Sequence, residues 1–162
     1  MAEVRWPPAY EPAITKVFVS NRITIPASPA VVWAWLIRAK RWPEWYPNSA
    51  NVQLPPGAGS DLGPDMQFHW RTFGLPLVST VREFAPHERI GWDGRAIGID
   101  VYHAWVLEKI GPRETLVLTE ESQNGWLSRL SHFMMPNRMS SQHQIWLEAL
   151  SAKAQSGLPE IL

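Results

Sequence analysis

The hydrophobic period of the chain changes at Gly125, and this change constrains the fold more than any other feature. Before Gly125, apolar and polar residues alternate in short runs, which is typical of half-buried strands. The clearest run covers residues 99–107. After Gly125 the apolar residues recur every three or four positions and form a long stripe over residues 139–154. We therefore predict an antiparallel sheet followed by a long C-terminal helix, which is an α+β arrangement.

Two short helices are expected between the first strand and the rest of the sheet. The first strand falls within residues 13–26, where alternate residues are apolar. Ser28 followed by Pro29 is a typical helix start, and the proline-bounded segment 41–47 predicts a second helical turn. Residues 54–65 are rich in glycine and proline and predict a loop. With the runs that follow this loop, we expect a sheet of about six to seven strands.

The long helix has to cover the apolar face of the whole sheet. A curved, twisted sheet with one helix across it rarely closes completely, so we expect an internal cavity between the two. Pro136 interrupts the helical pattern just before the long helix. Because methionine side chains flank this proline and adapt easily to different shapes, one interpretation is an entrance to the cavity, and the alternative is core filling beneath a bent helix.

The charge balance and the composition exclude several classes of protein. Fifteen Lys and Arg residues balance fifteen Asp and Glu residues, which argues against nucleic-acid binding and weakens a polybasic membrane anchor. The chain has no cysteine, so disulfides, thiolate metal sites and cysteine nucleophiles are excluded. No apolar run is long enough to form a transmembrane segment. The five histidines are dispersed without a ligand motif, so we expect no metal and no other cofactor.

We expect one domain over residues 13–157. An extended, proline-rich lead-in covers residues 1–12, and a short tail covers residues 158–162. The amino terminus lacks the basic and apolar runs of a targeting segment, so a cytoplasmic location is predicted. The sequence leaves open whether the protein is a monomer or a homodimer.

Several motifs resemble the START-like (SRPBCC) superfamily, and within it the polyketide cyclase/dehydrase-like group. They lie at residues 25–33, 42–47, 66–70, 79–86, 89–92, 103–105 and 119–122. The resemblance implies a helix-grip fold, in which a curved antiparallel sheet wraps around a long C-terminal helix. It also implies a hydrophobic or aromatic ligand held between the sheet and that helix. It implies little about chemistry, because only some proteins of this kind are enzymes.

The ligand pocket is expected where the inward face of the sheet meets the long helix. On the sheet the candidate residues are Phe68, Trp70, Val81, Trp92, His103 and Trp105. On the helical segment they are Met134, Met135, Met139, His143 and Trp146. The tryptophans on the sheet face would form an aromatic wall for a ring system or a long apolar chain. Plain core packing is the alternative interpretation of the same residues.

His103 is the leading catalytic candidate, because an imidazole on an otherwise apolar face could move a proton or bind a ligand oxygen. The alternative is a core histidine satisfied by one partner. Glu120 and Glu121 lie at the end of a strand, so one of them points to each face. The family pattern favours Glu121 as the inward residue. Leu116 and Leu118 instead favour Glu120, and the sequence leaves the choice open. An acid–base pair of His103 and Glu121 remains a hypothesis.

Three functions are compatible with these residues. The first is binding of a hydrophobic or aromatic small molecule, lipid-like or polyketide-like, in the internal cavity. The second is a cofactor-independent cyclase or dehydratase that uses an inward His and Glu on a polarised carbonyl. The third, weaker one is a protein-interaction or chaperone-like module, which a large exposed apolar patch without a cavity would favour. The sequence does not decide between binding and turnover.

Overall fold

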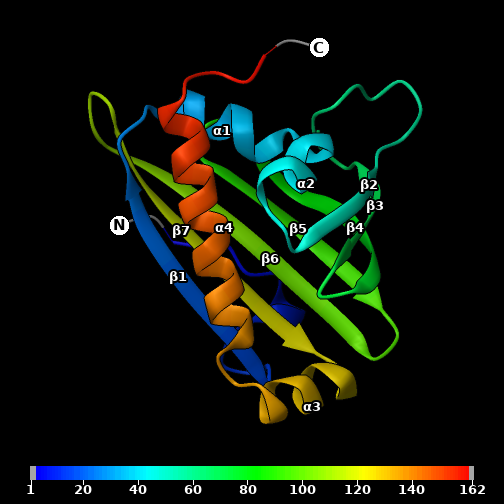
Figure 1. The fold of residues 1–162 in the computed structure, drawn as a ribbon. Coiled ribbons are helices and arrows are strands. Elements are labelled where there is room, and N and C mark those ends of the chain that lie inside the picture. The colour runs from blue at the N-terminus through cyan, green and yellow to red at the C-terminus, as the bar shows by residue number, and fades with distance from the viewer. Residues whose placement is uncertain (1–2, 161–162) are drawn as a thin grey trace.

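The computed structural model describes residues 3–160 and contains one strongly curved sheet (Figure 1). Its strands are β1 (Val17–Ile25), β2 (Ser49–Gln53), β3 (Gln67–Thr72), β4 (Leu75–Ala85), β5 (Arg89–Ala96), β6 (Ile99–Gly111) and β7 (Glu114–Asn124). They are ordered β1-β7-β6-β5-β4-β3-β2, and all neighbours are antiparallel. The predicted α+β class is confirmed. Strand β2 was not predicted, because only five residues form it and they lack a clear alternation.

The helices follow the sequence signals closely. They are the 3₁₀ helices η1 (Pro8–Tyr10) and η2 (Ala39–Arg41) and the α-helices α1 (Pro29–Ile37), α2 (Trp42–Trp45), α3 (Trp126–Met134) and α4 (Arg138–Gln155). Helix α1 starts at Pro29, where the fixed φ of proline suits a first helical position. Pro136 lies between α3 and α4, so the predicted interruption separates two helices rather than bending one.

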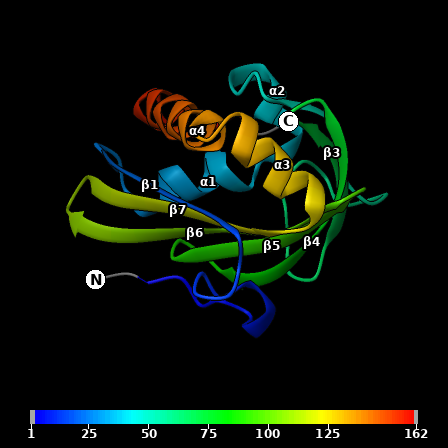
Figure 2. The same ribbon diagram turned by 90° about the horizontal axis from the view of Figure 1, so that it is seen from below.

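The two faces of the sheet are covered differently (Figure 2). The α-helices lie on the concave side, with α4 running along the sheet and α3 at one end of it. The N-terminal segment lies on the convex side, where Trp6 and Tyr10 pack against Tyr102 with ring centroids 5.9 and 5.6 Å away. Residues 1–2 of the predicted lead-in and 161–162 of the predicted tail lie outside the described residues. None of the helices in the described part is long and apolar enough to cross a membrane.

The register of β7 decides which glutamate faces inward. Thr115, Val117, Thr119 and Glu121 are all buried, so the odd-numbered positions face the concave side. Glu120 lies on the other face, where its side chain accepts a hydrogen bond from Ser20 Oγ at 2.8 Å. The inference that placed Glu120 on the inward face is therefore wrong. It failed because the leucines of β7 are only half-buried and lie on the convex side.

An aromatic cluster fills one half of the concave side. Trp42 of α2 lies at its centre, with ring centroids 5.2–6.0 Å from those of its neighbours. These neighbours are Phe68, Trp70, Trp92 and Trp146, and with Tyr46 and Trp105 they form the cluster. Tyr46 stacks on Trp146 at 4.4 Å. Because these rings occupy the half of the sheet next to α2, the open space on the concave side is displaced toward α3.

Candidate functional site

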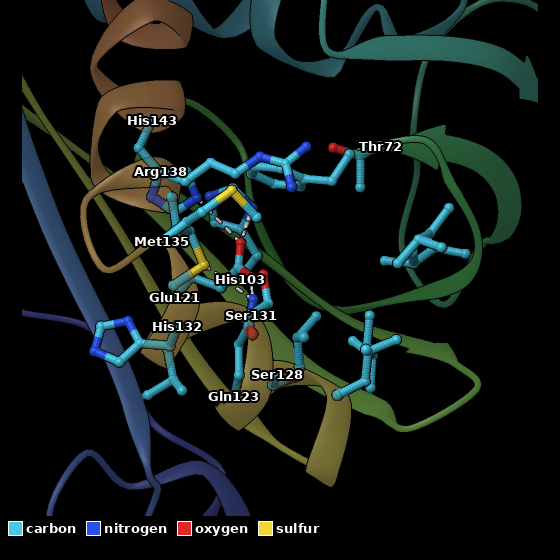
Figure 3. Close-up of a pocket in the computed structure, with 18 of the residues that line it drawn as sticks. Thr72, His103, Glu121, Gln123, Ser128, Ser131, His132, Met135, Arg138 and His143 are labelled. Carbon is cyan, nitrogen blue, oxygen red and sulfur yellow. Dashed lines mark hydrogen bonds and ion pairs between the residues drawn. The ribbon is translucent and has the colours of Figure 1, made fainter.

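A cavity of about 370 Å³ lies between the sheet and the α3–α4 region (Figure 3). Strands β1 and β3 to β7 supply its sheet side, and α3 and the first half of α4, as far as Trp146, supply its helical side. Most of its lining is apolar, with Leu77, Val101 and Trp92 among the buried residues. This is the size and character of a small-molecule pocket.

Eight of the eleven predicted ligand-binding residues line the cavity. They are Trp70, Trp92, His103, Met134, Met135, Met139, His143 and Trp146. Phe68, Val81 and Trp105 do not line it, although they face the concave side and are fully buried. The physical reason is the aromatic cluster: Trp42 covers Phe68, and Trp146 lies 5.0 Å from Trp105. Inward orientation alone therefore does not define a pocket wall.

The structure also places residues at the cavity that the sequence analysis missed. Gln123 lies two residues after Glu121 on the same face of β7, so it could have been identified only once Glu121 was known to face inward. Ser128 of α3 and Arg138 of α4 line the cavity as well. Phe73 lies in the β3–β4 turn with φ +52°, a conformation that no sequence pattern marked. Its ring lies under the Arg138 guanidinium at 5.1 Å, so these two cavity-lining residues contact each other.

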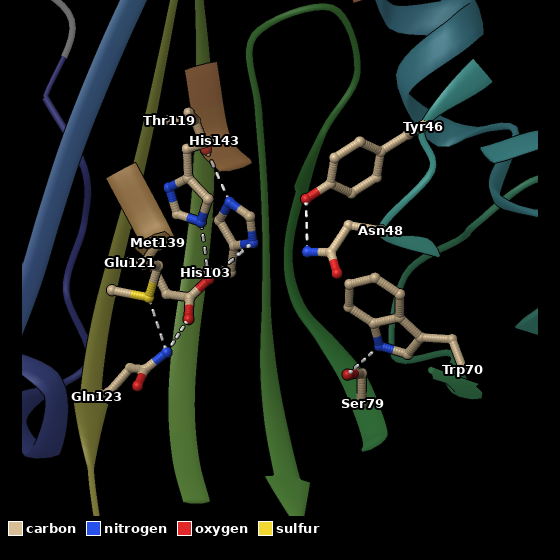
Figure 4. A network of polar contacts seen from close by, with 10 residues as sticks. All are labelled: Tyr46, Asn48, Trp70, Ser79, His103, Thr119, Glu121, Gln123, Met139 and His143. Carbon is tan, nitrogen blue, oxygen red and sulfur yellow. Dashed lines mark hydrogen bonds and ion pairs between the residues drawn. The ribbon is translucent and has the colours of Figure 1, made fainter. Parts of the chain in front are cut away.

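Two histidines and a glutamate meet at the bottom of the cavity, and we name them the His–Glu–His cluster (Figure 4). His103 of β6 and Glu121 of β7 are direct cross-strand partners, and His143 reaches them from α4. Glu121 Oε2 lies 3.3 Å from His103 Nδ1 and 3.1 Å from His143 Nε2. The Gln123 amide nitrogen donates a hydrogen bond to Oε1 of the same carboxylate. All three members of the cluster are buried.

The protonation states of the cluster follow from these contacts. Burial would raise the pKa of Glu121, but the hydrogen bond from His143 and the neighbouring imidazoles outweigh it and lower the pKa to about 2. Burial lowers the pKa of His103 to about 3, against the opposing effect of Glu121. Near neutral pH the cluster therefore combines a charged carboxylate with a neutral His103. The carboxylate is stabilised by the N–H groups that surround it.

The two histidines differ in their remaining capacity for hydrogen bonds. Both ring nitrogens of His103 have a partner, since Nε2 lies 2.7 Å from Thr119 Oγ1 and Nδ1 faces Glu121. His143 uses Nε2 toward Glu121, whereas its buried Nδ1 has no partner among the described residues. His103 is thus fixed in place. The remaining hydrogen-bonding capacity of the cluster therefore lies on His143 Nδ1.

The cluster has the donor set of a metal site but not the geometry. Its three potential ligand atoms lie within 4.8 Å of one another, although the residues are widely spaced in the sequence. The dispersed histidines therefore did not exclude a meeting in space. However, the rings of His103 and His143 stack, with centroids 4.7 Å apart and planes only 10° apart. An imidazole binds a metal through a lone pair in the ring plane, and two stacked parallel rings do not direct those lone pairs at one ion. The arrangement fits a hydrogen-bonded cluster better.

The curved sheet, the helix along its concave side and the cavity between them define a helix-grip protein. A family model described as polyketide cyclase / dehydrase and lipid transport matches residues 16–155. The chain belongs to this family. The family resemblance seen in the sequence is thereby confirmed. A search of curated proteins gives no match to the chain.

Several solved structures have the same fold. A hypothetical protein from Helicobacter pylori is 31% identical, with a TM-score of 0.88, and the match covers 95% of this chain and 97% of that one. The Zhui aromatase/cyclase from Streptomyces sp. R1128 is 14% identical, with a TM-score of 0.67 over 88% of this chain and 99% of that one. A START superfamily protein from Mycobacterium smegmatis is 13% identical, with a TM-score of 0.64 over 86% of this chain and 97% of that one. The last two show a common fold and no more.

Proposed function

We propose that the protein binds an apolar, largely flat small molecule that carries at least one oxygen atom. The observation that carries this proposal is a mostly apolar cavity with a buried His–Glu–His cluster at its bottom. Apolar walls supply the affinity, and a few fixed polar groups orient the ligand. The wall residues Trp70, Trp92 and Trp146 favour a ring system, because indole faces stack on flat molecules.

The need for a ligand oxygen is argued from unmet hydrogen bonds. Ser128 Oγ, His143 Nδ1 and Trp146 Nε1 belong to cavity residues, are buried and lack a partner among the described residues. Each such group costs about 1–3 kcal/mol. A ligand hydroxyl or carbonyl that engages one of them, after a small rotation of that side chain, recovers part of this cost. A pure hydrocarbon does not.

The experiment has two arms. Native mass spectrometry of the purified full chain identifies any retained compound, and titration with the neutral fluorescent probe N-phenyl-1-naphthylamine measures the apolar site. Leu75→Trp places an indole in the cavity and should abolish probe binding, because Leu75 is half-buried and lines the wall. Val78→Trp is the matched control, since Val78 lies on the same strand but is exposed. Equal probe affinity in the two variants would refute the proposed site.

A second candidate function is a cyclase or dehydratase reaction in the same cavity, and the partnerless nitrogen of His143 favours it. The carboxylate of Glu121 orients the His143 ring through Nε2, which leaves Nδ1 available to take a proton from a ligand. In this form His143 is the acid–base residue. His103, the residue predicted from the sequence, is a positioning residue.

Turnover is tested with the compound that native mass spectrometry recovers. Incubation with the wild-type chain should produce a species that has lost one water or has cyclised, and His143→Gln should stop its formation. His103→Gln should slow the reaction less. Unchanged product formation by His143→Gln would eliminate this acid–base assignment and leave binding alone.

A further inference from the structure

Helix α3 is amphipathic, but its apolar side is exposed and its polar side faces the protein. Trp126, Leu130, Phe133 and Met134 lie on one side of the helix and are exposed, with Phe133 at 85%. The opposite side carries Ser128 and Ser131, which are buried or half-buried and face the cavity. A helix that rests on a protein core normally does the opposite.

The outward side of α3 continues onto the neighbouring β5–β6 turn. Ile97 in that turn is 86% exposed, and the backbone of Gly98 accepts a hydrogen bond from the Leu127 N–H at 3.0 Å. This hydrogen bond holds the β5–β6 turn against the start of α3. We name the combined exposed surface the α3 patch; its residues are Ile97, Trp126, Leu130, Phe133 and Met134. A group of large apolar side chains on one surface marks an interaction site rather than random exposure.

The charged residues of α3 and of the segment that follows it are all cationic. Residues 125–147 contain no Asp or Glu, whereas Arg129 and Arg138 are present and exposed. Arg129 borders the apolar side of α3. Near the β5–β6 turn, Asp100 already faces Arg95 at 3.5 Å and accepts a hydrogen bond from Tyr10 at 2.7 Å. The zero net charge of the whole chain therefore hides a local cationic border.

The α3 patch is also continuous with the cavity. Leu130 and Met134 are exposed members of the patch and line the cavity at the same time. Arg138, whose guanidinium lies 5.1 Å from the centre of the Phe73 ring, lines the same cavity (Figure 3). The α3 patch and the cavity wall therefore share side chains.

We propose that the α3 patch docks on the surface of an anionic lipid bilayer. An outward apolar side with an aromatic anchor and a border of cations is the pattern of a helix that lies in a membrane interface. Trp126 suits a position at the membrane–water interface, because indole rings are enriched there. Arg129 and Arg138 supply the attraction to anionic headgroups. Because Leu130 and Met134 belong to the patch and also line the cavity, docking would bring this part of the cavity wall next to the bilayer. The proposal goes beyond ligand binding and does not depend on it.

The test is sedimentation of the full chain with vesicles of two compositions. One is phosphatidylcholine alone, and the other is an equal mixture of phosphatidylcholine and phosphatidylglycerol. The wild type should bind the mixed vesicles more strongly, and added salt should reduce the difference. Phe133→Asp should lower binding at least about tenfold, because it removes a ring that inserts into the bilayer on docking and adds a charge of the wrong sign. Met134→Asp is a second variant with the same expectation.

Matched controls separate the patch from general surface effects. Leu158 is 67% exposed and lies beyond the far end of α4, so Leu158→Asp should bind as the wild type does. Arg129→Gln should weaken binding to mixed vesicles about fivefold, whereas Arg113→Gln, in the β6–β7 turn, should have no effect.

Three outcomes would overturn the proposal. The first is a wild type that binds neither vesicle. The second is equal binding by Phe133→Asp, Met134→Asp and Leu158→Asp. The third is a dimer seen by analytical ultracentrifugation that Phe133→Asp abolishes, together with no vesicle binding; the patch would then join two copies of the chain.

Discussion

Replacing Glu121 tests the arrangement at the bottom of the cavity most directly. In Glu121→Leu the side chain keeps a similar volume but accepts no hydrogen bond. The N–H groups of His103, His143 and Gln123 that face the carboxylate then lose their acceptor. Each buried donor without a partner costs about 1–3 kcal/mol. Removing the buried charge recovers some desolvation cost, so the net loss in unfolding free energy should be about 2–4 kcal/mol.

Glu121→Gln should be less damaging. The amide oxygen still accepts one hydrogen bond, and His143 can move its proton to Nδ1, which has no competing partner among the described residues. We expect a loss of about 1–2 kcal/mol. Glu120→Gln is the control: this neighbouring residue bonds to Ser20 on the exposed face, so its replacement should change stability by less than about 0.5 kcal/mol.

The assay is urea unfolding at pH 7, followed by far-UV circular dichroism. The wild type and Glu120→Gln should have the highest urea midpoints, Glu121→Gln a lower one and Glu121→Leu the lowest. A buried ion pair can be replaced by apolar residues without loss of stability when all of its partners are replaced together. In Glu121→Leu only the acceptor is removed, and the donors stay buried without a partner. A Glu121→Leu variant as stable as the wild type would refute the view that the carboxylate holds the cluster together.

Three further predictions concern other parts of the fold. The pKa of His103 falls from 6.5 to about 3 on folding, so between these pH values the unfolded chain binds a proton that the folded chain does not. The free energy of unfolding should therefore decrease as the pH is lowered from 6.5 to about 3. His103→Gln should remove a slope of about 1.4 kcal/mol per pH unit, measured by urea unfolding at several pH values. Gly125→Ala should cost several kcal/mol in urea unfolding, because φ is +103° and the new Cβ would contact the Gly98 carbonyl. Gly57→Ala, with φ +81° and open space around it, should cost only about 1 kcal/mol. Trp6→Ala should lower stability by about 1–2 kcal/mol without changing probe affinity, since Trp6 lies on the convex side of the sheet.

The elements of the fold were largely predictable because each has a local cause. Alternation placed the long strands, and Pro29 placed the start of α1. The inward face of β7 was not predictable from its own residues. Both faces of this strand carry apolar side chains, and pairing with β6 sets Glu121 opposite His103. A one-residue ambiguity in a strand therefore becomes an ambiguity about the site.

The site itself was predicted in part, and the failures share a cause. His103, Glu121 and His143 were each named, but their meeting depends on how α4 packs across the sheet. In the same way, the pocket wall depends on Trp42, which comes from a four-residue helix. Neither the approach of His143 to the two sheet residues nor the position of Trp42 over the sheet is determined by the sequence of a single helix or strand. Side chains from different elements decide which inward residues face open space.

The break at Pro136 explains how one chain can have a well-packed helix and a reversed one in succession. Had the pattern continued as a single helix, the apolar stripes of α3 and α4 would lie along one axis and both would face the sheet. The segment between Met134 and Arg138 instead lets α3 take its own orientation at the end of the sheet. There its serines line the cavity, while the large apolar side chains of its other side are exposed. The break between α3 and α4 therefore produces the surface for which we propose a bilayer, so α3 variants that change vesicle binding need not disturb the aromatic cluster.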